Sequence, residues 1–144
     1  METSQELLEL EQCVCTRVRT AARLITRAYD KTLRPAGIKA SQLAVLAAVA
    51  SVEVTSIVAL SKALCMDRTT LSRNLKPLVS EKLVTLTEDG GGRSKTARIT
   101  KAGQAKLTEA VPLWRKAQLA LAEQAGEGRL NDLNVRLFHL IRTY

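Results

Sequence analysis

One segment of the chain, DRTTLSRNLKPL at positions 67–78, gathers hydroxyl and cationic side chains at helical spacing. Leucines recur in it at intervals of four and three residues, the pattern of a helix with one buried face. The opposite face carries two hydroxyls and two cations and no acid; these residues are Thr69, Ser72, Arg73 and Lys76. Such side chains suit the edges of DNA bases and phosphate oxygens. The segment therefore predicts a DNA-contacting helix, with Arg68 and Thr70 as further candidates, against the alternative of a solvated polar face.

A shorter helix and a turn precede this segment and must set its angle. Apolar residues at intervals of three and four predict a helix with one buried face, at Ile57, Leu60 and Leu64. A turn at Cys65-Met66 follows. Asp67 is a good N-cap because its carboxylate can accept the unpaired N–H groups of the next turn. The two helices and the turn predict a helix-turn-helix.

A hairpin with a basic tip follows the second helix. Residues 83–87 favour a strand, the run Asp89-Gly90-Gly91-Gly92 favours a turn, and residues 93–99 favour the return strand. Arg93, Ser94 and Lys95 would stand at the tip. A flexible cationic tip beside a cationic helix is the layout of a winged helix-turn-helix, with the helix in the major groove and the tip on the backbone or minor groove.

The flanking segments are predicted to be helical. Apolar residues repeat every seven positions from about Ser4 to Leu33, which predicts one long helix that ends at Arg34-Pro35-Ala36-Gly37. A second apolar helix is expected over 42–49, and a brief third strand over 52–55. Pro77 should bend its helix without ending it. After the wing, a helix is expected over 101–124 and a last amphipathic helix over 130–141, separated by Gly126-Glu127-Gly128.

The alanine-rich helix after the wing needs a packing partner, as does the long first helix. Its apolar face is expected to comprise Ala102, Ala105, Ala110, Leu113, Trp114, Ala117 and Leu121. The terminal helices carry more apolar surface than a small winged core can cover, which indicates a homodimer. Two-fold symmetry in turn predicts a pseudo-palindromic DNA site with half-sites about one helical turn apart.

Composition limits the remaining classes of function. The 144 residues carry a formal net charge of +8, which favours a polyanionic partner. No apolar run approaches the ~20 residues that cross a bilayer, and the acidic start METSQELLEL is not a signal peptide, so a cytoplasmic protein without membrane contact is expected. Three cysteines and the lone His139 make no plausible metal site. No catalytic constellation or nucleotide loop is present, so neither enzymatic activity nor a cofactor is expected.

The segment DRTTLSRNLKPL, the following hairpin with its glycine-rich basic tip and the run RITKAG together resemble the MarR family of bacterial transcriptional regulators. The resemblance covers nearly the whole chain. It implies a mainly α fold with a small β-hairpin wing (α+β). In that fold a winged helix-turn-helix DNA-binding core, about 38–100, is flanked by N- and C-terminal dimerisation helices, about 4–34 and 101–144, in a single domain over 1–144. One departure is Gly91, which stands where the family's wing usually has an Asp.

The resemblance also implies how binding would be controlled. Family members are two-fold dimers, most often repressors, and typically release double-stranded DNA when a small anionic or phenolic effector enters the cleft between dimerisation helices and winged domain. The cationic first helix is compatible with an anionic effector. An alternative from another class is a winged-helix module that binds protein or RNA and has no operator.

Cysteine offers a second alternative, a thiol-based redox-sensing regulator of the same fold. The organic-hydroperoxide-sensing branch of the family has a reactive Cys eight residues before an Arg, which matches Cys15 and Arg23, and a Tyr that matches Tyr29. Arg19 stands where that branch has another Tyr. Cys13 and Cys15 would point about 200° apart on a continuous helix and could not pair without breaking it. The plainer interpretation is that these thiols are small packing residues.

Overall fold

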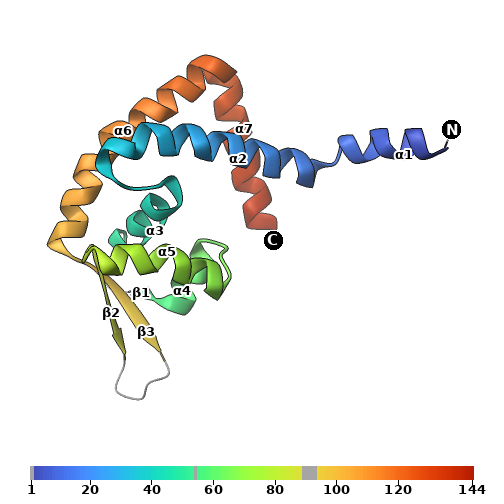
Figure 1. Cartoon of the computed structure of the whole chain (residues 1–144). Coiled ribbons are helices and arrows are strands. Elements are labelled where there is room, and N and C mark those ends of the chain that lie inside the picture. The colour runs from blue at the N-terminus through green and yellow to red at the C-terminus, as the bar shows by residue number, and fades with distance from the viewer. Residues whose placement is uncertain (1, 54, 89–93) are drawn as a thin grey trace.

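The structure is a computed structural model that describes residues 2–53, 55–88 and 94–144 (Figure 1). Its elements, in chain order, are α1 Glu2–Glu11, α2 Val14–Leu33, the 3₁₀ turn η1 Arg34–Ala36, α3 Ala40–Ala50, β1 Thr55–Ser56, α4 Ile57–Ala63, α5 Arg68–Ser80, β2 Val84–Glu88, β3 Lys95–Ile99, α6 Lys101–Ala125 and α7 Glu127–Thr143. Helices α2, α6 and α7 lie on one side, and α3, α4, α5 and the sheet lie on the other. The expected mainly α fold with a winged helix-turn-helix core is confirmed.

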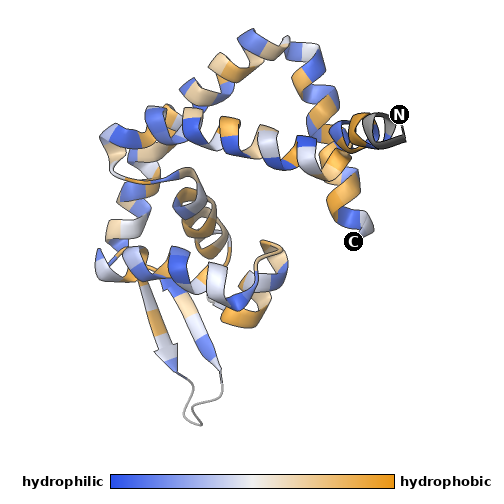
Figure 2. Ribbon diagram, turned by 45° about the vertical axis from the view of Figure 1, so that its right-hand side comes forward, coloured by the Kyte–Doolittle hydropathy of each residue, from blue (hydrophilic) through white to orange (hydrophobic). Residues whose placement is uncertain are grey.

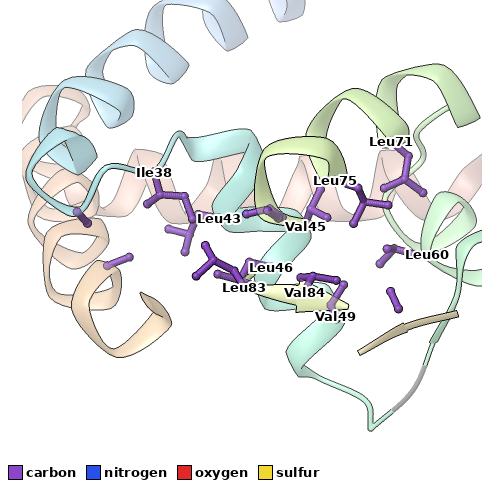
Figure 3. Close-up of a cluster of buried hydrophobic side chains, with 14 of the residues drawn as sticks. Ile38, Leu43, Val45, Leu46, Val49, Leu60, Leu71, Leu75, Leu83 and Val84 are labelled. Carbon is purple, nitrogen blue, oxygen red and sulfur yellow. The ribbon is translucent and has the colours of Figure 1, made fainter. Parts of the chain in front are cut away.

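The core is centred on α3, which is apolar on most of its surface. Val45, Leu46 and Val49 are fully buried, and they share one cluster with buried leucines of α4 and α5 (Figure 3). Helix α3 packs against α2, α5, α6 and β3. Because aliphatic residues make up this cluster, the 3% aromatic content of the chain is enough for a closely packed interior.

The sheet has three antiparallel strands in the order β1-β3-β2. Val84 pairs with Ile99 at its base and Glu88 pairs with Lys95 toward the tip. The brief third strand that the sequence predicts is present, but it comprises Thr55–Ser56, where Thr55 pairs with Ala97. The tip residues of the wing, 89–93, lie outside the described residues.

Helix α5 begins and continues as the sequence predicts. Asp67 caps it, because its Oδ1 accepts the Thr70 N–H at 2.8 Å. Leu71, Leu75 and Leu78 are buried on its inner face. The helix continues past Pro77 to Ser80, so the proline does not end it.

The prediction of one long helix over 4–33 is wrong. The chain forms α1 and α2, separated at Gln12-Cys13. The Cys13 N–H donates to the Leu10 carbonyl at 3.1 Å, a tightened last turn, and Cys13 has an extended ψ of 120°. Cys, Val and Thr, which make up CVCT at positions 13–16, are weak helix formers. No residue of this segment is buried, so packing does not hold the helix continuous there.

The C-terminal helices also differ in detail from the expectation. Helix α6 contains Pro112 and ends at Ala125, where Gly126 adopts a φ of +86°. Glu127 and Gly128 then belong to α7 and not to the break. Ala102, Ala105 and Trp114 are exposed, so the packing face of α6 is narrower than expected; Ala110 and Ala117 are buried on it.

Hydrophobic residues recur along the outer helices α1, α2 and α7 (Figure 2), and many of their large apolar side chains are exposed. No residue of α7 is buried. Exposed large apolar side chains on α1, α2 and α7 include Leu7, Leu8, Leu10, Val14, Val18, Leu24, Leu133, Val135, Phe138, Leu140 and Ile141. Exposed apolar side chains in this number are typical of helices that pack against another surface.

A close crossing joins α6 to the base of the wing at Gly103. The Thr100 hydroxyl accepts the Gly103 N–H at 3.0 Å and donates to the Lys82 carbonyl at 2.7 Å. A Cβ at Gly103 would lie 2.2 Å from the Leu83 carbonyl oxygen and 2.7 Å from Cγ1 of Ile99. Only glycine fits there without moving the strand.

We predict that Gly103→Ala lowers the free energy of unfolding by about 1–3 kcal/mol, because the methyl group overpacks a backbone contact. Urea denaturation followed by circular dichroism measures the change. Gly128→Ala is the matched control, since a Cβ there meets nothing within 4 Å and alanine favours a helix. Equal stability of Gly103→Ala and wild type would contradict the close crossing.

We also predict a pH-dependent contribution from Asp67. Hydrogen bonds from the Thr70 N–H and then the Thr70 hydroxyl lower the pKa of the Asp67 carboxyl. A lowered folded-state pKa stabilises the fold above the unfolded value of about 3.9, and the contribution is lost as pH falls through the folded value. Asp67→Ala should therefore lower the melting temperature at pH 6, and its difference from wild type should shrink toward pH 3. The control is Asp67→Asn, which keeps an N-cap residue without the charge. A difference in melting temperature between Asp67→Ala and wild type that does not change with pH would refute the role of the Asp67 carboxylate.

Candidate nucleic-acid interface

The outer face of α5 carries the side chains that the sequence singles out for DNA contact. All six are exposed: Arg68, Thr69, Thr70, Ser72, Arg73 and Lys76. The inner face of the same helix is held in the core by its three buried leucines. Because one side of α5 is buried, the polar side must face outward, and the structure brings these six residues together on one surface.

The start of α5 is held by a local network. The Thr70 hydroxyl donates to Oδ2 of Asp67 at 2.8 Å, and the Asn74 side-chain amide donates to the Thr70 carbonyl at 3.0 Å. The Thr70 hydroxyl proton is thus engaged within the chain, whereas its oxygen can still accept a hydrogen bond. Asn74 adds an amide, which the sequence analysis did not single out.

The turn between α4 and α5 is closed by a serine that sequence analysis missed. The Met66 N–H donates to the Ser61 carbonyl at 3.0 Å, and the Ser61 hydroxyl donates to the Met66 carbonyl. Cys65, between them in the chain, adopts a left-handed φ of 49°. No local sequence signal identifies Ser61, because its partner lies five residues away across a turn.

Cations on α5 are available for an external anion. Arg68, Arg73 and Lys76 make no ion pair among the described residues. Phosphate groups bind such side chains and release counterions on doing so. The face of α5 therefore combines uncompensated positive charge with hydroxyl groups that can hydrogen-bond to bases.

Two cations of the wing form ion pairs with glutamates. Lys95 lies 3.3 Å from Glu88, directly opposite it in the hairpin register, and Arg98 lies 3.7 Å from Glu53. Both pairs are exposed, and exposed pairs are weak enough for phosphate to compete. Ser94 is exposed beside the tip, whereas Arg93 lies outside the described residues. The Glu88–Lys95 pair has a sequence signal, since an acid and a base stand on opposite sides of the glycine run, two positions before it and three positions after it.

Two of the three thiols, Cys13 and Cys15, lie at the start of α2, away from α5 (Figure 1), whereas Cys65 lies in the turn between α4 and α5. Cys13 is the N-cap of α2 and half-buried, and Cys15 is exposed in the first turn. Hydrogen bonds from the backbone N–H and the hydroxyl of Thr16 lower the pKa of the Cys13 thiol. Because Cys13 lies outside the regular helix, the separation of about 200° expected for the two thiols on a continuous helix does not apply to them.

A cleft of about 420 Å³ separates α2, α3 and α6. Its lining is mostly apolar and consists of Tyr29, Ala40, Leu43, Ala44, Ala47, Leu107, Val111 and Trp114. The Tyr29 hydroxyl donates to Oε1 of Gln118, and burial raises the pKa of Tyr29. An apolar cleft with an aromatic side chain and a polar group suits a small, partly apolar molecule.

Two further features of the described residues bear on function. They contain no group of three or more His, Cys, Asp or Glu side chains arranged to hold a metal ion. None of their helices combines the length and apolar character needed to span a membrane.

Comparison with known proteins was made on sequence and structure. No family model matches the chain, and no curated protein matches it. The transcriptional regulator MosR of M. tuberculosis, solved in complex with DNA, is 31% identical with a TM-score of 0.80, covering 91% of this chain and 95% of that chain. A mutant of MarR from E. coli in complex with operator DNA is 22% identical with a TM-score of 0.77, covering 94% and 95%.

A third solved structure is BpsR of Bordetella bronchiseptica, whose DNA binding is regulated by 6-hydroxynicotinic acid. It is 21% identical with a TM-score of 0.75 and covers 91% of this chain and 92% of that chain. The likeness to MarR and BpsR shows the shared winged-helix fold, and the likeness to MosR extends to the sequence over nearly the full length of both chains. The protein therefore belongs to the MarR family of transcriptional regulators.

Proposed function

We propose that the protein is a DNA-binding transcriptional repressor that reads duplex DNA with α5 and the wing. The observation that carries this proposal is the outer face of α5, where Arg68, Arg73 and Lys76 stand exposed beside hydroxyl groups and without ion pairs among the described residues. MosR and MarR, which are similar to this chain, have both been solved in complex with DNA.

The residues divide by the chemistry of their side chains. Thr69, Ser72 and Arg73 lie where a helix in the major groove contacts bases, and an arginine there can bind guanine through two hydrogen bonds. Arg68 and Lys76 supply charge for phosphates, and Thr70 supplies an acceptor oxygen. At the wing, Arg93, Ser94 and Lys95 contact the backbone or the minor groove. Phosphate would displace Glu88 from Lys95 on binding.

The acting species is a homodimer held by its terminal helices, about 4–34 and 101–144, around winged units of about 38–100. The support is the exposed apolar surface of α1, α2 and α7. Burial of this surface against a second copy contributes roughly 25 cal/mol for each Å² of apolar area removed from water. The loss of translational, rotational and side-chain freedom on association opposes this contribution. Two recognition helices related by a two-fold axis bind half-sites about one helical turn apart.

A small anionic or phenolic effector releases the DNA by entering the cleft between α2, α3 and α6. Trp114 and Tyr29 line this cleft, which lies where the outer helices meet the winged core. A ligand that prefers the spacing of the two winged units that does not fit DNA weakens DNA binding. By thermodynamic linkage, DNA weakens the binding of that ligand by the same factor. The regulation of BpsR by 6-hydroxynicotinic acid supports this class of effector.

A second candidate function is redox sensing, favoured by the break between α1 and α2. Cys13 is the N-cap at that break, its pKa is lowered by Thr16, and Cys15 follows two residues later. A lowered pKa raises the reactive thiolate fraction at neutral pH. The resemblance matched Cys15 to the reactive position, whereas this geometry supports Cys13 as the first thiol to react and Cys15 as its partner.

The redox chemistry balances with a hydroperoxide as the oxidant. The Cys13 thiolate attacks the peroxide, forms a sulfenic acid and releases hydroxide or alkoxide. The Cys15 thiol then attacks the sulfenic sulfur, forms a disulfide and releases water. Pairing requires the two Cβ atoms to come within about 3.5–4.5 Å of each other.

We predict that Arg73→Ala weakens binding to the duplex upstream of the protein's own gene by about 10–100-fold and relaxes base preference, as expected for a base-contacting arginine. Fluorescence anisotropy across a salt series measures both effects against a scrambled duplex. Arg115→Ala removes an equal charge from exposed α6 and should leave affinity near wild type. Wild-type affinity in Arg73→Ala would refute the assignment, and preference for single strands or RNA would favour the interaction-module alternative.

For the thiols we predict that a slight excess of hydroperoxide leaves one titratable thiol of the three and weakens DNA binding. Cys15→Ser should stop at a sulfenic acid that dimedone traps, because the second thiol is absent. Cys13→Ser should react slowly, and Cys65→Ser should behave as wild type apart from its missing thiol. Three free thiols and unchanged DNA affinity after peroxide would remove the redox candidate.

A further inference from the structure

A second cavity, of about 660 Å³, lies between the end of α2, η1, the start of α3 and the end of α5. Its lining comprises Arg27, Asp30, Lys31, Arg34, Gly37, Ile38, Lys39, Gln42 and Glu81. It shares no lining residue with the apolar cleft that contains Trp114. Whereas the residues that line that cleft are mostly apolar, six of the nine residues that line this cavity are charged, so the two suit different ligands.

The cavity has an excess of positive charge. Arg27, Lys31 and Arg34 recur at intervals of four and three residues, which places them on one face of the helical segment. Lys39 adds a fourth cation from the start of α3. Against these four stand two carboxylates, Asp30 and Glu81, so the lining carries two more positive than negative charges.

The carboxylates do not pair with these cations. Oδ1 of Asp30 accepts the Ala40 N–H at 2.7 Å, at the start of α3. Among the described residues, none of the four cations lies within 4.0 Å of a carboxylate oxygen. Four exposed cations that line one cavity without carboxylate partners repel one another, and an anion bound among them offsets that repulsion.

Neutral groups complete the lining. The side-chain oxygen of Gln42 accepts the Lys39 N–H at 3.1 Å, which leaves the Gln42 amide nitrogen as a donor. Ile38 is 4% exposed and supplies an apolar wall. A Cβ on Gly37 would meet nothing within 4 Å, so the entrance is open at that point.

We infer that this cavity binds a small organic dianion, whose two negative charges come from carboxylates or from a phosphate group. The excess of two positive charges matches this class, and the volume lies within the usual range of about 300–1,000 Å³ for small-molecule sites. Such a ligand joins α2 to the end of α5. The inference goes beyond the proposed function and does not depend on DNA binding.

The test is isothermal titration calorimetry of the reduced full chain with two probes, inorganic phosphate and succinate, at constant ionic strength. We expect saturable binding of at least one probe with a Kd below about 1 mM. The double variant Arg27→Gln/Lys31→Gln should weaken it at least about tenfold, because charge-assisted hydrogen bonds are lost. Tighter binding of phosphate would identify a phosphate-bearing ligand, and tighter binding of succinate a dicarboxylate.

The matched control is Arg115→Gln/Lys116→Gln, which removes the same charge from exposed residues of α6 outside the cavity and should leave probe affinity within about twofold. Circular dichroism verifies that both double variants fold. Equal weakening in both variants would mean unspecific attraction and would overturn the inference, as would the absence of saturable binding. Loss of DNA affinity in Arg27→Gln/Lys31→Gln, without any probe binding by wild type, would instead assign the cavity to the DNA-binding surface.

Discussion

The packing of α5 on α3 is the constraint on which the rest of the protein depends. Leu71, Leu75 and Leu78 enter the same apolar cluster as Val45 and Val49. A helix that buries one face has no freedom to rotate about its axis, so the hydroxyls and cations on its other face are held outward. The Asp67 cap and the Ser61–Met66 turn hydrogen bonds then fix where that face begins. Hydrophobic burial thereby determines the geometry of a polar surface.

The outer helices show the opposite balance. Helix α7 has no buried residue, and α1 and the first half of α2 contribute to no packed layer within the chain. Apolar side chains of these helices stay exposed to solvent in a single chain, which is why dimerisation and regulation are proposed there. The break at Cys13 lies in this region. A segment with little packing has a low local cost of opening, which favours a sensor whose two thiols must approach each other.

Two cavities of different chemistry lie where the helical layer meets the winged core. The apolar cleft is bounded by α2, α3 and α6, and the cationic cavity by α2, α3 and the end of α5. Helices α2 and α3 take part in both. A molecule bound in either one would contact both α2 and α3, and α5 packs on α3. The junction is therefore where ligand binding and recognition-helix position are mechanically closest.

The sequence by itself determined the winged helix-turn-helix core. The leucine spacing of α5, the Asp67 cap, the wing strands and the six outward residues of α5 all followed from local periodicity, because side-chain spacing alone decides which face of a helix is apolar. The sequence also indicated that the terminal helices lack partners. It failed where the decision is not local: the break at Cys13, the exposure of Trp114 and the Ser61 contact.

Tertiary structure decided those points because each depends on which neighbours a segment meets. A heptad pattern continues through Cys13, yet without packing the weak helix formers there do not keep the helix intact. In the sequence nothing distinguishes Gly103 from other helical residues, because its close contact with the Leu83 carbonyl exists only in the fold. The cationic cavity shows the same limit: Arg27, Lys31 and Arg34 look like a solvated face in the sequence, and only the fold adds Lys39, Gln42 and Glu81 around them.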